Sequence, residues 1–144
     1  MIRFKYERLR IELENAHPKL IQLVNWGNDY LDEDIGLELI ISDVARTPEE
    51  EKALYAKHPE LMPKGFGPHV VKPTRAADAE IRNDQTTMNH TQAWHLGLAI
   101  NRYWQYDPER PGLNCCLIHD VGNGWHCHLQ VHDRTRLRKQ TTNL

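Results

Sequence analysis

The sequence predicts an α+β fold in which a small antiparallel sheet ends in a C-terminal hairpin and is flanked by helices. Segments with apolar residues at helical spacing are mixed along the chain with segments in which apolar and polar residues alternate. The last two alternating segments flank Gly122-Asn123-Gly124, and an Asn-Gly pair between such segments is a strong hairpin signal. The chain has 144 residues and no internal repeat, which predicts a single domain over residues 1–144.

The first fourteen residues leave two interpretations open. Residues 2–6 alternate as in a strand, whereas Tyr6, Leu9 and Leu13 fit one face of a helix. Pro18 then opens a clearer helix, because apolar residues follow it at helical spacing as far as residue 31.

A strand and a capped helix are expected next. Residues 35–41 alternate between apolar and other side chains, which predicts a strand. Thr47, Pro48 and Glu50 combine an N-cap, a first-turn proline and the acidic residue of a capping box. This pattern predicts a helix that begins there and runs to about Lys57.

The middle of the chain is expected to be a long loop followed by a strand and a helix. Residues 58–73 contain four prolines and two glycines, which predicts an extended loop. The loop leads to a short strand over 75–81. Residues 91–104 then fit a helix in which Trp94, Leu98 and Ile100 face the core.

The expected hairpin has strands over 115–121 and 125–132, and its second strand has two different faces. Alternation places His126, His128, Gln130 and His132 on one face and Trp125, Cys127, Leu129 and Val131 on the other. Because the second set is largely apolar, we expect that face to be buried.

The turn decides where His119 of the first strand lies. A two-residue turn brings His119 to the histidine face, opposite His128 if the turn is Asn123-Gly124 and opposite His126 if it is Gly122-Asn123. A three-residue loop would place His119 on the other face.

Charge and composition exclude several function classes. Lys and Arg total 18 against 20 Asp and Glu, so the net charge of −2 provides no overall attraction to nucleic acid or to an anionic membrane. No apolar run is long enough to span a bilayer, and the first residues lack the apolar stretch of a secretory signal. The 3 cysteines are odd in number and two of them are adjacent, which favours a reducing compartment, and the absence of a Cys-x-x-Cys pair disfavours a thiolate zinc site. We therefore expect synthesis in the cytoplasm, and neither nucleic acid nor membrane as a partner.

Histidine is the unusual residue type, with 9 in the chain. His69 follows a Gly-Pro pair in the long loop, and Asp78 lies nine positions later on the expected strand. One His from a loop, one Asp from a strand and one His from the hairpin would give three metal ligands and an open fourth position, the arrangement of catalytic zinc. The alternative is a solvated strand face whose histidines bind nothing.

Four short motifs follow one another along most of the chain: Arg46-Thr-Pro-Glu-Glu, Pro68-His69, Arg75-Ala-Ala-Asp78 and Trp125-His126-Cys-His128. In this order they resemble the zinc D-alanyl-D-alanine carboxypeptidase family, which includes phage L-alanyl-D-glutamate endopeptidases, murein endopeptidases and the hedgehog signalling-domain fold. The family pattern is an Arg at a strand–helix junction, a His-to-Asp segment and a closing strand with Trp-x-His or His-x-His. The resemblance extends from about His17 to His132 and implies a hedgehog-like fold.

The resemblance also implies roles for individual residues. His69, Asp78 and His128 match the zinc ligands, and His126 takes the outer position beside the metal. Arg46 matches the Arg that binds the substrate carbonyl or carboxylate, to which a guanidinium can offer two donors. The implied activity is a zinc-dependent hydrolysis of amide bonds in peptidoglycan stem peptides, of the D-Ala-D-Ala carboxypeptidase or the L-Ala-D-Glu endopeptidase type. A phage-derived endolysin of this kind would act at the cell wall after lysis or delivery, or within a phage particle.

Two departures from the family pattern bear on catalysis. The spacing from His69 to Asp78 is longer than usual, and Trp125 stands where the family has a catalytic Glu. The general base must then be another group, with His126 the first candidate and Asp120 and His119 the others. If none of them acts, the chain would be a metal-binding assembly or binding module of a phage particle. A metal-dependent nuclease is disfavoured by the net charge.

Overall fold

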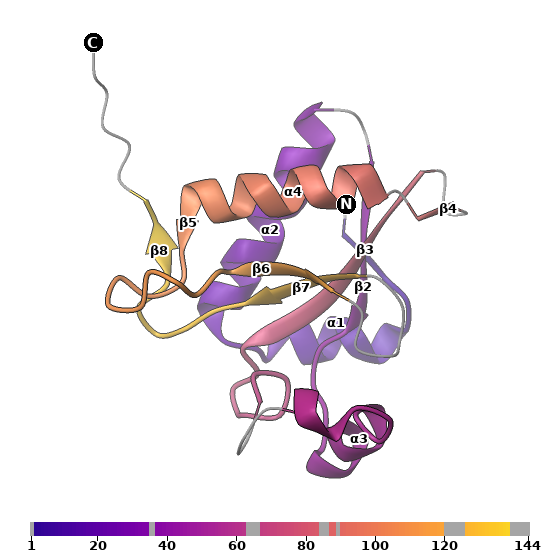
Figure 1. Ribbon diagram of the computed structural model, residues 1–144. Coiled ribbons are helices and arrows are strands. Elements are labelled where there is room, and N and C mark those ends of the chain that lie inside the picture. The colour runs from indigo at the N-terminus through magenta and orange to yellow at the C-terminus, as the bar shows by residue number, and fades with distance from the viewer. Residues whose placement is uncertain are drawn as a thin grey trace.

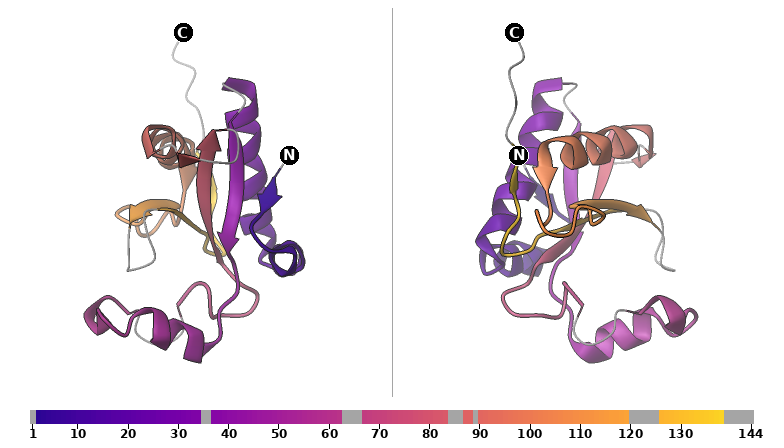
Figure 2. Two further views of the ribbon diagram at one scale, coloured as in Figure 1. Left: turned by 90° about the vertical axis from the view of Figure 1, so that its right-hand side faces the viewer. Right: turned by 60° about the vertical axis from the view of Figure 1, so that its left-hand side comes forward.

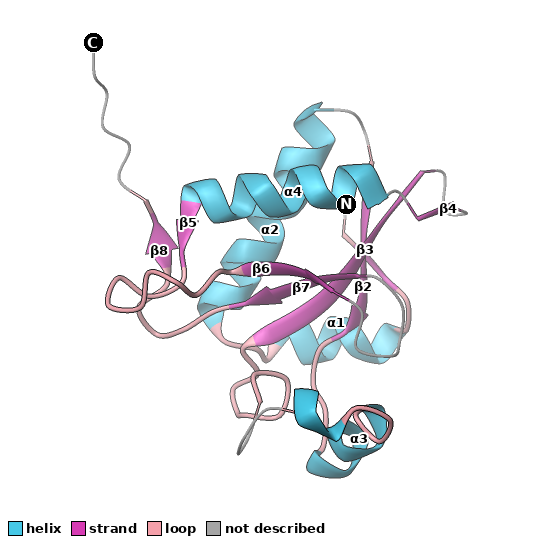
Figure 3. Ribbon diagram, in the orientation of Figure 1, coloured by secondary structure: helices cyan, strands magenta, loops and turns pink. Residues whose placement is uncertain are grey.

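The computed structural model describes residues 2–34, 37–62, 67–83, 87–88, 90–119 and 126–138. The helices of this part of the chain are α1 (Glu7–Glu14), α2 (Pro18–Asp34), α3 (Pro48–Leu54) and α4 (His90–Tyr103), with a 3-10 turn at Pro59–Leu61. The strands are β1 (Arg3–Phe4), β2 (Glu38–Asp43), β3 (Ala76–Asn83), β4 (Thr87–Met88), β5 (Trp104–Gln105), β6 (Cys116–His119), β7 (His126–Gln130) and β8 (Arg136–Leu137). The predicted α+β class is confirmed (Figure 3).

Strands of the main sheet lie in the order β1-β2-β3-β7-β6, and β4 pairs with β3. Strands β5 and β8 form a second, two-stranded sheet that the sequence did not predict. The expectation of a purely antiparallel sheet is wrong, because β1 pairs with β2 in parallel. Helices α1 and α2 lie between these two strands in the sequence, and a connection of that length allows the chain to return to the same end of the sheet (Figure 1).

The core lies between one face of the main sheet and helices α2 and α4. Ala77, Ala79 and Ile81 of β3 are fully buried in this core, as are Cys127 and Leu129 of β7. The predicted apolar face of the last strand is therefore confirmed within the described residues. Figure 2 shows α3 at the end of the molecule away from α4, and α3 contributes no residue to the hydrophobic core.

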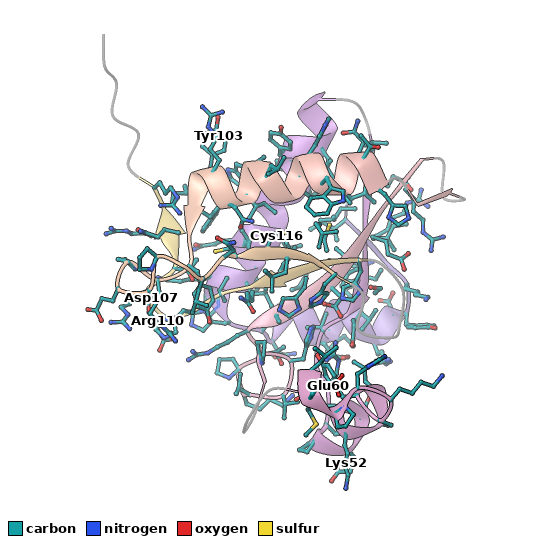
Figure 4. All side chains as sticks on the ribbon, viewed as in Figure 1. Lys52, Glu60, Tyr103, Asp107, Arg110 and Cys116 are labelled. Carbon is teal, nitrogen blue, oxygen red and sulfur yellow. The ribbon has the colours of Figure 1, made fainter. Side chains whose placement is uncertain are left out.

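The expected inward face of α4 is wrong for Trp94 and Leu98 and correct for Ile100. Trp94 is 53% exposed and Leu98 is 65% exposed, whereas Leu96 and Ile100 are fully buried. The helix is rotated relative to the prediction because it packs closely against β6. A Cβ added at Gly97 would lie 3.4 Å from the sulfur of Cys116, which lies between α4 and β6 (Figure 4).

Both interpretations of the N-terminus are realised, since β1 is followed directly by α1. The predicted capping box of α3 is confirmed: the Thr47 side chain accepts a hydrogen bond from the Glu50 backbone N–H, and the Glu50 side chain accepts one from the Thr47 N–H. The helix ends at Leu54, earlier than expected. Among the described residues, no helix has the length and apolarity needed to cross a membrane.

Candidate metal centre

Three side chains from distant parts of the sequence meet on the face of the sheet opposite α4. His69 lies in the turns that precede β3, while Asp78 and His128 are direct partners in the pairing of β3 with β7. All three are buried, and their ligand atoms lie within 4.8 Å of one another. The long spacing between His69 and Asp78 does not keep them apart, so the predicted ligand trio is brought together as a group that could hold a metal ion.

His69 is oriented by the chain segment that follows β2. Its backbone carbonyl accepts a hydrogen bond from the Arg46 N–H at 2.9 Å, and its Nδ1 lies 2.5 Å from the carbonyl oxygen of Val44. Because a carbonyl oxygen only accepts hydrogen bonds, Nδ1 carries the hydrogen. Nε2 is then left to face Oδ1 of Asp78 at 3.2 Å.

His128 is oriented by Gln130, two residues along β7. The Gln130 Nε2 donates to the Asn114 carbonyl at 2.9 Å, so the amide oxygen faces His128. That oxygen lies 2.9 Å from the His128 Nε2, which therefore carries the hydrogen. The His128 Nδ1 faces Oδ1 of Asp78 at 3.2 Å.

The three groups that converge here could hold a cation. Burial alone would raise the pKa of the Asp78 carboxyl, but His69 and His128 hold that pKa well below its usual range. Asp78 is therefore ionised at neutral pH. Two imidazoles and one carboxylate are a donor set that suits zinc.

Two more histidines lie beside the trio. The His126 Nε2 lies 3.5 Å from Oδ1 of Asp78. The His119 ring lies 4.8 Å from the His126 ring and 5.3 Å from the His128 ring, measured between centroids. Burial, and then His128 and His126, lower the pKa of His119 to about 4, so that its ring is neutral at pH 7.

The strand pairing fixes which histidines share this face. His119 pairs with His126, which is the register predicted for a Gly122-Asn123 turn. The turn itself, and with it Asp120 and Trp125, lies outside the described residues. The prediction that His132 belongs to the face is wrong, because β7 ends at Gln130 and His132 lies 3.9 Å from Oδ2 of Asp107 instead.

Arg46 is buried next to the trio and is surrounded by carboxylates. Its Nε donates to Asp43 at 2.7 Å, its Nη1 to Glu51 at 3.3 Å and its Nη2 to Asp78 at 3.0 Å. An irregularity in β2 between Ile41 and Asp43 places Asp43 opposite Asp78. Burial disfavours the charged form of Arg46, but Asp78 and Asp43 raise its pKa, so the guanidinium stays charged.

A cavity of about 240 Å³ adjoins the trio. It is lined by Arg46, Glu51, Tyr55, Leu61, Pro68, His69, Leu117, His119, His128 and Gln130. Sequence reasoning missed Glu51 and Tyr55 as parts of the site. Both are buried; Glu51 lies within α3 and Tyr55, four residues later, is its C-cap. That spacing, directly after the predicted N-cap, is the signal that would have placed both side chains on one helix face.

No family model matches the chain, and neither a curated protein nor a solved structure is significantly similar to it.

The cysteines do not contribute to this site. Cys127 lies on the core face of β7, where its sulfur is 3.9 Å from the Ala93 carbonyl oxygen. Burial raises the pKa of the Cys115 thiol to about 12, and a hydrogen bond to Cys127 together with burial raises that of Cys116 well above its usual value. These two thiols are therefore protonated and unreactive at neutral pH.

Proposed function

We propose that this chain is a zinc-dependent peptidase that hydrolyses amide bonds in peptidoglycan stem peptides. The observation that carries the proposal is the convergence of His69, Asp78 and His128 beside a cavity. Two imidazoles and one carboxylate leave a coordination position for a reacting group, as in catalytic rather than structural zinc sites. The substrate class is supported by the order of the motifs, which resembles that of the D-alanyl-D-alanine carboxypeptidase family.

Residues of the chain orient the metal ligands and transfer the proton. Zinc bound by the trio supplies a Lewis acid that acidifies water and polarises a carbonyl group. The Val44 carbonyl and Gln130 fix which nitrogen of each ligating histidine faces the ion. We assign the general base to His126, which lies closest to Asp78 among the histidines outside the trio. His126 would accept a proton and return it to the leaving amine.

Arg46 holds Asp78 in place and still has hydrogen atoms to donate. A guanidinium has five N–H hydrogens, and the bonds to Asp43, Glu51 and Asp78 use three of them. The remaining hydrogens allow Arg46 to bind a substrate carbonyl oxygen at the edge of the cavity.

Metal content and product analysis test the proposal together. The purified protein is expected to carry about one zinc ion per chain, measured by inductively coupled plasma mass spectrometry, and to cleave muropeptides, followed by mass spectrometry of the products. The variants His69→Ala and Asp78→Ala should lose the metal and the activity, whereas the surface variant Glu49→Gln should keep both. Full zinc occupancy in the first two variants would contradict the ligand assignment.

One observation favours a second candidate, a metal-binding module without turnover. Trp125 stands where the resembled family has its catalytic Glu. A protein that binds zinc stoichiometrically but cleaves no muropeptide would support this candidate and contradict the peptidase.

A further inference from the structure

The charges around the cavity bear on which part of a peptide it can hold. Among the described residues that line it, Arg46 is the only permanent cation. A carboxypeptidase must accommodate the free terminal carboxylate of its substrate close to the bond that it cleaves. An endopeptidase meets an uncharged amide at the same place.

Arg46 can bind a neutral carbonyl oxygen with its unused hydrogens, but it offers no uncompensated charge to such a carboxylate. Recognition of a carboxylate by arginine normally uses two neighbouring N–H groups of a free guanidinium fork. Here Nη1 donates one of its two hydrogens to Glu51 and Nη2 one of its two to Asp78, and both carboxylates are buried, so the positive charge of the guanidinium is already balanced. Displacing Glu51 in favour of a substrate would leave a buried carboxylate without its cation, which is costly.

The charge balance of the cluster leads to the same conclusion. Three carboxylates against one guanidinium leave two negative charges in excess. A divalent ion held by the trio brings the cluster to neutrality, so no positive charge remains to attract an anion. Glu51 also lines the cavity itself, where low solvent access weakens the screening of its charge.

We propose that the cavity binds a peptide through an internal, uncharged amide and rejects a free terminal carboxylate. This inference rests on the proposed peptidase function and specifies it: the chain acts within peptides, as an endopeptidase, rather than at their C-terminal end. Glu51 is the residue that sets this specificity.

A matched pair of metal-binding probes tests the inference without requiring turnover. Succinic acid monohydroxamate carries a metal-binding group at one end and a carboxylate at the other, and its twin carries a carboxamide in place of the carboxylate. Dissociation constants of both are measured on the cobalt-substituted protein from its visible absorption bands. We expect the carboxamide to bind at least about fivefold more tightly, because one repulsive contact with Glu51 is absent.

The variant Glu51→Gln should bring the two dissociation constants close together, because it removes the charge that lines the cavity. The control Glu49→Gln makes the same change on the exposed side of α3 and should leave the ratio unchanged. Equal or tighter binding of the carboxylate by the parent protein would overturn the inference, and this measurement does not depend on whether the Glu51 variant folds. A parent that binds no cobalt would contradict the proposed function as well, whereas one that binds cobalt and prefers the carboxylate contradicts only the inference.

Discussion

Gln130 determines which nitrogen of His128 faces the centre of the candidate metal site. Its amide is held between the Asn114 carbonyl and the ring of His128, and this arrangement fixes the side on which His128 carries its hydrogen. Val44 does the same for His69 through a backbone carbonyl. The two histidines therefore face Asp78 with different nitrogens, Nε2 for His69 and Nδ1 for His128.

Replacing Gln130 should weaken metal binding without removing a ligand. We expect Gln130→Leu to lower zinc affinity by roughly tenfold to a hundredfold, because the His128 ring loses the acceptor that orients it. Competition with a chromogenic chelator measures this change. Gln130→Glu keeps an acceptor for His128 and should retain most of the affinity. An unchanged affinity in the leucine variant would show that Gln130 does not orient the ligand.

His126 and His128 should have separable roles although they lie two residues apart on β7. His128→Ala should lower zinc affinity and activity together, since only His69 and Asp78 would remain as ligands. His126→Ala should keep the metal but reduce turnover by roughly 10² to 10⁴, the usual contribution of a general acid–base. Metal analysis and muropeptide cleavage rates measure the two effects. Metal loss in the His126 variant with retention in the His128 variant would mean that the roles are reversed.

At the level of elements, several predictions that depended on local patterns were correct. The capping box of α3, the helix from Pro18 and the alternating faces of β7 follow from neighbouring residues alone. The grouping of His69 and Asp78 with a hairpin histidine followed from the residue types, but the choice of His128 among the hairpin histidines came from the resemblance, because it depends on the pairing of β3 with β7.

Features that depend on long-range packing were missed. The exposed side of α4 is set by its contact with β6 at Gly97, and nothing within the helix sequence indicates that contact. Likewise, the enclosure of Arg46 by three carboxylates requires both the irregularity in β2 and the approach of α3. Glu51 was therefore not recognised as part of the site.

The cap of α3 should control how firmly Glu51 and Tyr55 are held. We expect Thr47→Ala to reduce the free energy of local opening of α3 by about 1 kcal/mol, because the Glu50 N–H loses its acceptor. Amide hydrogen exchange followed by mass spectrometry should then show roughly fivefold faster exchange in α3. Thr47→Ser keeps the hydroxyl and serves as the control. Equal protection in the alanine variant would mean that contacts with the rest of the protein, not the cap, hold the helix.

For the molecule as a whole, the buried titratable groups link stability to pH. In the unfolded chain His119 takes up a proton near its ordinary pKa of 6.5, whereas in the folded protein it does so only at about 4. Between these values the unfolded state binds more protons, so stability falls as the pH is lowered. The lowered pKa of Asp78 adds a further loss below about pH 4, where the unfolded carboxylate becomes protonated first.

Urea unfolding of the metal-free protein at a series of pH values should therefore show a free energy of unfolding that decreases from about pH 6.5 toward pH 4. His119→Gln removes the group responsible and should flatten the decrease over this range. The decline below about pH 4 should remain in that variant, because it comes from Asp78. An identical pH profile in parent and variant would contradict the assignment to His119.

The register that places Asp78 opposite His128 also joins parts of the chain that are 50 residues apart. An ion held by both residues acts as a removable cross-link, because it closes a long loop and restricts the unfolded chain in the way a disulfide does. The cysteines at positions 115, 116 and 127 are free, so they provide no such link. The free concentration of metal would then determine the melting temperature as well as the activity. Removing the ion with a chelator would then lower the melting temperature without changing any covalent bond of the chain.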